Sequence, residues 1–166
     1  IAQALGLAER FVGQDKCIVI LGDNIFEQPI TTHAAAFEEQ ASGARVLLRH
    51  VEDPQRFGVA TVEDGRIVRI VEKPTEPESD LAVTGIYMYG PEAFDYIRHL
   101  KPSDRGELEI TDVNNAFIEA GSLSYSVLDG SWTDAGTFES LAVANRLAEN
   151  LMLKVFEDSI GHGRAG

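Results

Sequence analysis

The chain has 166 residues, 44% of them hydrophobic, which is enough to bury the core of a globular domain. Lys and Arg number 14 against 27 Asp and Glu, giving a formal net charge of −13. Such a charge repels nucleic acid and anionic lipid at long range, so it argues against a protein that binds either of them. No apolar run approaches the length of about 18 residues that indicates a membrane span.

The cysteine content and the amino terminus bear on the cellular compartment. Cys17 is the single cysteine, so no internal disulfide can form, and its apolar neighbours predict a packed thiol rather than a reactive one. The first residues lack the basic segment and apolar core of a secretory signal. The sequence therefore favours a cytoplasmic protein.

The first half of the chain predicts alternating helices and strands. Residues 1–11 have helical spacing, so the chain starts inside a helix and without a methionine, which suggests a piece of a longer protein. The apolar residues 17–21 predict a strand, and residues 32–43 predict a helix that ends at Gly43. Residues 44–51 predict a strand covered on both faces. This order of strand, helix and strand favours a parallel pair with a crossover.

The second half adds an antiparallel element. Residues 58–74 predict two short strands joined at Asp64-Gly65, because Asp-Gly between alternating apolar runs is a strong hairpin signal. The remaining elements are a strand at 81–90, a helix beginning with Pro91, a helix at 107–121 ending at Gly121, a strand at 122–130 and a closing helix at 137–157.

Together these elements predict an α/β protein with a mixed, mainly parallel sheet and an inserted antiparallel hairpin. We find no internal repeat, low-complexity segment or flexible linker, so we expect residues 1–166 to form a single domain. Ligands of open α/β sheets bind at the carboxyl ends of the strands, and polar residues there are the first candidates for a site.

Four charged groups lie at junctions between predicted elements rather than on helix faces: Asp23, the pair Glu72-Lys73, Arg105 and Asp134. Two aspartates on separate elements can offer oxygen ligands to one Mg²⁺, which usually keeps several waters. A lysine and an arginine are the usual means of holding a phosphate. The combination suggests phosphoryl or nucleotidyl transfer.

Each signal also has a purely structural interpretation when taken alone. Asp23 could cap a following turn, and Asp134 could cap the helix that begins near Thr137. Lys73 could be an exposed charge on a sheet edge, and Arg105 could pair with Asp104 or Glu107. A pair such as Tyr87 and Tyr89 on one strand face is more often core than ligand platform.

Five segments in order carry a resemblance: LGDNIF, DPQRFGVA, VEKPTEPESDLAVTGIYMY, KPSDRGELEITDVN and WTDAGTFESL. From residue 1 to about residue 149 the chain resembles the glucose-1-phosphate thymidylyltransferases, a group of sugar-phosphate nucleotidyltransferases. The resemblance implies a Rossmann-like nucleotidyltransferase fold. It also implies nucleotidyl transfer from dTTP to glucose 1-phosphate, with dTDP-glucose and pyrophosphate as products.

The resemblance assigns roles to individual residues. It implies that Asp23 and Asp134 bind Mg²⁺ and that Lys73 and Arg105 hold the sugar phosphate, so that these four are the catalytic set. The substrate-binding residues that it implies are Asn24, Gly58, Glu72, Val83, Gly85, Tyr87 and Trp132. Members of the family are usually homo-oligomers, and dTDP-glucose typically feeds deoxysugar and polysaccharide synthesis.

The chain departs from the family at its amino terminus. The glycine-rich loop that holds the triphosphate and the turn that contacts the base are absent from the sequence. We therefore expect the chain alone to have little or no transferase activity. Two alternatives stay open: a pyrophosphorylase that uses UTP, and a non-catalytic module that binds sugar phosphate or regulates assembly.

Overall fold

The computed structural model describes the backbone of residues 1–161 and the side chains of residues 1–153. The chain falls into two compact units. Unit 1 comprises Ile1–Ile20 and Ile30–Leu128, and unit 2 comprises Leu21–Pro29 and the residues from Asp129 onward.

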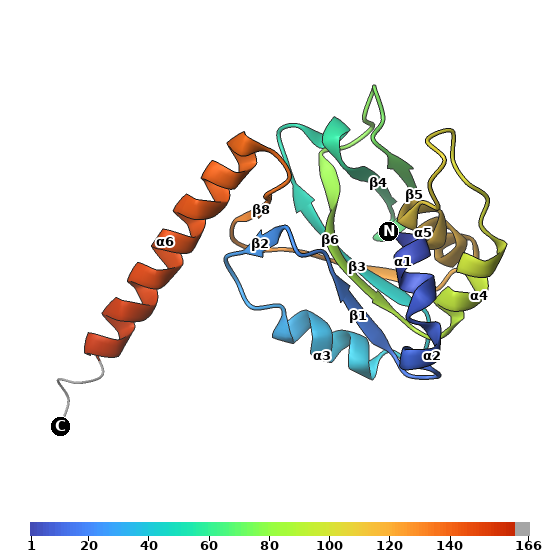
Figure 1. Cartoon of the computed structure of the whole chain (residues 1–166), viewed down its shortest axis with the longest axis horizontal. Coiled ribbons are helices and arrows are strands. Elements are labelled where there is room, and N and C mark those ends of the chain that lie inside the picture. The colour runs from blue at the N-terminus through green and yellow to red at the C-terminus, as the bar shows by residue number, and fades with distance from the viewer. Residues whose placement is uncertain (162–166) are drawn as a thin grey trace. The chain divides into compact units, whose positions relative to one another are not determined.

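Unit 1 is a sheet with helices on both faces, and α3 lies on the face opposite α4 and α5 (Figure 1). Its strands are β1 (Cys17–Ile20), β3 (Ala44–His50), β4 (Gly58–Glu63), β5 (Arg66–Glu72), β6 (Leu81–Tyr89) and β7 (Leu123–Val127). Its helices are α1 (Ala2–Leu7), α2 (Glu9–Val12), α3 (Thr31–Glu39), α4 (Glu92–His99) and α5 (Ile110–Glu119), with a short 3-10 helix η1 (Pro54–Arg56).

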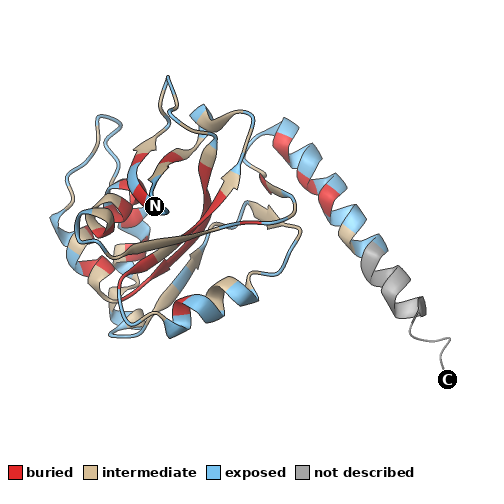
Figure 2. Ribbon diagram, turned by 180° about the vertical axis from the view of Figure 1, so that it is seen from behind, coloured by how far each residue is buried: buried red, intermediate tan, exposed pale blue. Residues whose placement is uncertain are grey.

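The strand β6 is the centre of the sheet. The strand order is β5-β4-β6-β3-β7, and β1 also pairs with β6. One edge of β6 bonds to β3, while the other edge bonds to β4 at Ala82 and to β1 from Ile86 to Tyr89. Buried residues concentrate along β6 and β3 (Figure 2). Burial also raises the pKa of the Cys17 thiol, as expected of a packed cysteine.

The predicted α/β class, the mixed sheet and the inserted hairpin are confirmed, but the expectation of mainly parallel pairing is wrong. Among the described strands, β3 and β7 form the one parallel pair, and every other pairing is antiparallel. The strands β1 and β3 do point the same way, yet β6 lies between them instead of leaving them adjacent. An apolar strand does not encode which other apolar strand it will pair with.

The hairpin turn follows its sequence signal closely. Asp64 and Gly65 have φ angles of 48° and 73°, as a two-residue turn with left-handed central residues requires.

The helix predicted at residues 32–43 ends earlier than expected. In the structure α3 stops at Glu39, and Gly43 lies just before β3. Gln40, the residue after α3, has an extended conformation.

The last carbonyl groups of α3 are satisfied by a side chain from another part of the chain. The Lys16 ammonium donates to the carbonyl oxygens of Phe37 at 2.9 Å, Glu38 at 2.7 Å and Gln40 at 2.5 Å. It also lies 5.1 Å from the centre of the Phe37 ring. A cation at this end of a helix is favoured by the helix dipole.

We expect Lys16→Met to lower the free energy of unfolding by about 2 kcal/mol, because hydrogen bonds from a charged donor are lost while the aliphatic stem is retained. Urea unfolding of the chain measures this change. Lys101→Met is the matched control, since Lys101 is an exposed lysine. Equal stabilities of the two variants would contradict a capping role for Lys16.

Unit 2 contains two short strands that the sequence analysis did not identify and a helix that it did. The strands β2 (Asn24–Phe26) and β8 (Trp132–Asp134) form a two-stranded antiparallel sheet, and α6 (Phe138–Gly161) follows. The closing helix was expected over almost the same residues. Taken over the part of the chain that the structure describes, no helix combines the length and the apolar composition of a bilayer span.

Candidate functional site

The pairing of β2 with β8 brings the two predicted metal ligands together. Asn24 lies opposite Asp134 in this ladder, directly after Asp23. Asp23 belongs to a turn in which the Asn24 N–H donates to the Leu21 carbonyl at 3.1 Å. The Ala135 N–H donates to the carbonyl oxygen of Asp23 at 2.7 Å. Residues more than 100 positions apart in the sequence therefore lie side by side.

The carboxylates of Asp23 and Asp134 face a space that a glycine leaves open. A Cβ atom at Gly136 would lie 3.1 Å from Oδ2 of Asp134 and 3.8 Å from Oδ2 of Asp23. Within the described residues, no three His, Cys, Asp or Glu side chains form a metal-binding group. Two carboxylates with open space beside them fit Mg²⁺, which takes one or two carboxylates and completes its shell with water and phosphate oxygens.

Asn24 and Trp132 are tied to this carboxylate pair by a chain of hydrogen bonds. The Trp132 indole Nε1 donates to Oδ1 of Asn24 at 2.8 Å, and Nδ2 of Asn24 donates to Oδ1 of Asp23 at 2.8 Å. Such bonds orient a carboxylate that binds a metal. Both residues were predicted as substrate contacts, and that prediction stays open.

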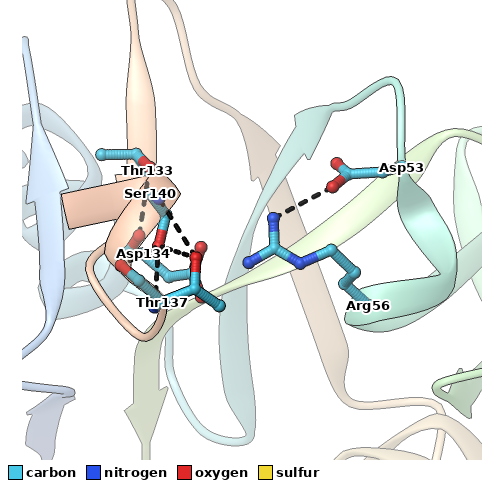
Figure 3. A network of polar contacts seen from close by, with 6 residues as sticks. All are labelled: Asp53, Arg56, Thr133, Asp134, Thr137 and Ser140. Atoms are coloured by element: carbon cyan, nitrogen blue, oxygen red, sulfur yellow. Dashed lines mark hydrogen bonds and ion pairs between the residues drawn. The ribbon is translucent and has the colours of Figure 1, made fainter. Parts of the chain in front are cut away.

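Figure 3 shows that the helix after Asp134 has a different cap. Thr137 and Ser140 bond reciprocally: the Ser140 N–H donates to Oγ1 of Thr137 at 3.1 Å, and the Thr137 N–H donates to Oγ of Ser140 at 3.0 Å. This is a capping box at the start of α6. Thr137 therefore has the capping role that the alternative interpretation gave to Asp134.

In unit 1, Glu72 and Gly58 are paired across β4 and β5. The Thr111 hydroxyl donates to Oε2 of Glu72 at 2.6 Å. A Cβ atom at Gly58 would lie 3.4 Å from both of these oxygens. Thr111 is buried, so it holds one side of the Glu72 carboxylate in a fixed orientation. Sequence reasoning missed Thr111, and its place in the segment KPSDRGELEITDVN is the signal that could have indicated it.

Lys73 follows Glu72 in an unusual backbone conformation. Its φ angle is 43°, in the left-handed region, and Pro74 comes next. The Lys73 N–H donates to the Phe57 carbonyl at 2.9 Å, which holds this conformation. The side chain is exposed, and its ammonium pairs with no described residue. Strained residues of this kind cluster at functional sites, but the interpretation as an edge charge is equally compatible.

The segment before Gly58 is held by an ion pair. Nη1 of Arg56, the last residue of η1, lies 3.0 Å from Oδ2 of Asp53, the residue before η1 (Figure 3). The Arg56 guanidinium also lies 5.1 Å from the centre of the Phe57 ring. These contacts position the chain where it enters β4.

Arg105 lies in the loop before α5 and faces three carboxylates. Its Nη2 is 3.5 Å from Oε2 of Glu107, as the structural interpretation expected, while its Nη1 is 3.7 Å from Oε1 of Glu109 and 3.9 Å from Oε1 of Glu72. Three carboxylates therefore surround the one arginine of this loop. On α5, burial and then the charge of Glu109 raise the pKa of Asp112.

The remaining predicted residues lie on β6. Val59 pairs with Ala82, and Gly58 and Val83 are the chain neighbours of these two residues on β4 and β6. Tyr87 is 5% exposed and stacks on Tyr89 with ring centres 6.1 Å apart. Gly85 is buried as well, so on β6 the predicted contacts lie within the packed sheet.

Tyr89 belongs to the core beneath this strand. Its hydroxyl donates to Oδ1 of Asn114 at 2.6 Å, which ties β6 to α5. Burial raises the pKa of Tyr89 well above its ordinary value, so the phenol stays neutral. The interpretation of this aromatic pair as core holds for Tyr89.

Comparisons with known proteins point to one family. The family model described as "Nucleotidyl transferase" matches residues 1–150. The glucose-1-phosphate thymidylyltransferase of Neisseria meningitidis serogroup A is 46% identical over 85% of this chain and 50% of its own length. The low-salt glycan biosynthesis nucleotidyltransferase Agl11 of Haloferax volcanii is 41% identical over 99% of this chain and 48% of its own length. The chain thus spans about half the length of these curated relatives.

Solved structures give the same result. A crystal structure from Bacillus anthracis, described as a glucose-1-phosphate thymidylyltransferase in complex with a sucrose, matches with a TM-score of 0.85 and 57% identity, covering 89% of this chain and 60% of that one. A UDP-glucose pyrophosphorylase matches with a TM-score of 0.79 at 24% identity, which supports the fold alone.

Proposed function

The chain belongs to the nucleotidyl transferase family, and we propose that it is the sugar-phosphate-binding part of a glucose-1-phosphate thymidylyltransferase. In the proposed reaction an oxygen of the glucose 1-phosphate group forms a bond to the α-phosphorus of dTTP. The bond from that phosphorus to the pyrophosphate group breaks, so dTDP-glucose and pyrophosphate leave. No covalent intermediate on the protein is required, and positioning and charge neutralisation supply the catalysis.

The observation that carries this proposal is the pair of carboxylates beside Gly136. Asp23 and Asp134 would hold Mg²⁺, which when bound neutralises negative charge on the phosphates. A module that only bound a sugar phosphate would have no need of two such carboxylates. The names of the relatives from Neisseria meningitidis and Bacillus anthracis support the same reaction.

The residues of unit 1 would recognise the sugar phosphate. Arg105 and Lys73 would hold the phosphate, one with a planar fork of donors and the other with a point charge. Glu72, oriented by Thr111, would accept hydrogen bonds from sugar hydroxyls. A half-buried acceptor held in this way discriminates against analogues that lack the hydroxyl, because it would then be left without a donor from the substrate.

The proposal extends to the setting of the protein. We propose a cytoplasmic location, supported by the single cysteine, and a homo-oligomeric complete protein, supported by the family. The proposed product, dTDP-glucose, is a nucleotide sugar that would be used in polysaccharide synthesis. The relative from Haloferax volcanii is named for glycan biosynthesis.

The test is pyrophosphate release from dTTP, glucose 1-phosphate and Mg²⁺, measured for this chain and for the protein extended to the length of its relatives. We expect turnover by the extended protein and little or none by this chain. Turnover with UTP in place of dTTP would reassign the nucleotide. If the extended protein is inert with every nucleoside triphosphate and sugar phosphate, the proposed enzymatic function is wrong and the alternative of a binding module is favoured.

A further inference from the structure

The three carboxylates around Arg105 differ in how firmly they are held. The Glu109 side chain is 13% exposed, and its Oε1 accepts a hydrogen bond from the Ser103 hydroxyl at 2.8 Å. The Glu72 side chain is 28% exposed and is held by Thr111. Glu107 is 56% exposed, and among the described residues its carboxylate contacts Arg105 alone. Two of the three partners are therefore anchored, and one is free to move.

The anchored carboxylates contact one nitrogen of the guanidinium. Nη1 of Arg105 faces both Glu72 and Glu109, whereas Nη2 faces Glu107. An arginine that is 47% exposed would otherwise sample many rotamers, which a bound phosphate would have to restrict. The two anchored carboxylates attract Nη1 from within ion-pair distance, at 3.7 and 3.9 Å, and leave Nη2 available to an anion that displaces Glu107.

Ser103 also organises the backbone of this loop. Its N–H donates to the Glu107 carbonyl at 2.8 Å, and its own carbonyl accepts from the Gly106 N–H at 2.8 Å. Its hydroxyl oxygen accepts from the Arg105 N–H at 3.3 Å while donating to Glu109. Ser103 thus bonds to the backbone at Arg105 and to the carboxylate that faces its side chain.

We propose that Glu109, anchored by Ser103, is a positioning residue that orients Arg105 for the phosphate of the sugar phosphate. This inference rests on the proposed function. Glu109 acts through Arg105 and does not itself touch the substrate. Glu107, at the shorter distance from Arg105, has no such role and is displaced when the phosphate binds.

Glu107→Gln and Glu109→Gln form a matched pair, because each removes one negative charge that faces the same arginine. Charge alone predicts that both variants bind an anion more tightly. The proposal predicts instead that only Glu109→Gln weakens binding. Glu107→Gln should leave the Kd for glucose 1-phosphate unchanged or lower it by up to about fivefold, whereas Glu109→Gln should raise it about tenfold. Isothermal titration of the chain with glucose 1-phosphate measures both.

Ser103 supplies an independent check. Ser103→Ala should also raise the Kd for glucose 1-phosphate. Ser103→Thr should keep the Kd of the unmodified chain, because threonine retains the hydroxyl that anchors Glu109. The double variant of Ser103→Ala and Glu109→Gln should be no weaker than Glu109→Gln alone, since both act on one chain of contacts. Thermal unfolding of each variant separates loss of the fold from loss of affinity.

Arg105→Ala distinguishes failure of this inference from failure of the proposed function. If the chain binds glucose 1-phosphate and Arg105→Ala loses that binding, while Glu109→Gln and Glu107→Gln shift the Kd equally, the positioning role is wrong and the function stands. If the unmodified chain does not bind glucose 1-phosphate, or if Arg105→Ala binds it as tightly as the unmodified chain does, both proposals are overturned.

Discussion

Asp134→Asn is expected to lower Mg²⁺-dependent pyrophosphate release on the order of 10³-fold in the extended protein, and Asp23→Asn should do the same. Both carboxylates face the space at Gly136, and an amide replaces a charged oxygen ligand by a neutral one. Several kcal/mol of charge neutralisation would be lost, and about 1.4 kcal/mol corresponds to a factor of ten in rate. The initial rate at saturating dTTP and glucose 1-phosphate checks the expectation.

Asp64→Asn is the control for this prediction, because Asp64 is exposed at the hairpin turn and asparagine tolerates its positive φ. It should retain full activity. Mg²⁺-dependent stabilisation of this chain against heat supplies a readout besides activity, and it should disappear in both site variants. Undiminished stabilisation by Mg²⁺ in Asp23→Asn and Asp134→Asn would remove these residues from the metal site.

Gly43→Ala should lower the free energy of unfolding by about 3 kcal/mol or more, the largest effect on stability that we expect. Gly43 has a φ angle of 89°, which side chains rarely adopt. An added Cβ atom would also lie 2.2 Å from the carbonyl oxygen of Ser122. That carbonyl accepts the Ala44 N–H at 2.9 Å, so it cannot move without loss of a backbone bond. Urea unfolding measures the change.

Gly121→Ala separates the two causes in this prediction. Gly121 has a φ of 67°, but nothing lies within 4 Å of the position that its Cβ would occupy. The substitution should therefore lower the free energy of unfolding by only about 1 kcal/mol, because alanine disfavours the left-handed conformation. If Gly43→Ala is no more destabilising than Gly121→Ala, the close approach at Ser122 does not constrain the fold.

Features that depend on neighbouring residues could be predicted from the sequence. The hairpin at Asp64-Gly65 and the end of α5 at Gly121 follow from the backbone freedom of glycine at a turn and at a helix end. The same local rule failed at Gly43, where the glycine is needed because the chain approaches Ser122 closely. The Lys16 cap of α3 also comes from another segment, so no local pattern announces it.

The residues of the candidate site could be predicted from the sequence, but their arrangement could not. The resemblance selected Asp23, Asp134, Glu72, Lys73 and Arg105, and the charges and their places at junctions suggested phosphoryl chemistry. The adjacency of Asp23 and Asp134 required the pairing of β2 with β8, two strands of three residues each. Strands of that length carry no periodic signal, since they are stabilised by their partner rather than by their own pattern.

The sequence by itself determined the α/β class, the turns and the chemical types available at the site, because these follow from periodicity, glycine conformation and charge. The tertiary structure alone decided the order of strands around β6 and the hydrogen bond from Thr111 to Glu72. It also decided which of the carboxylates that face Arg105 are anchored by other residues. These features depend on contacts between segments far apart in the chain, and many pairings of apolar strands are compatible with one local pattern.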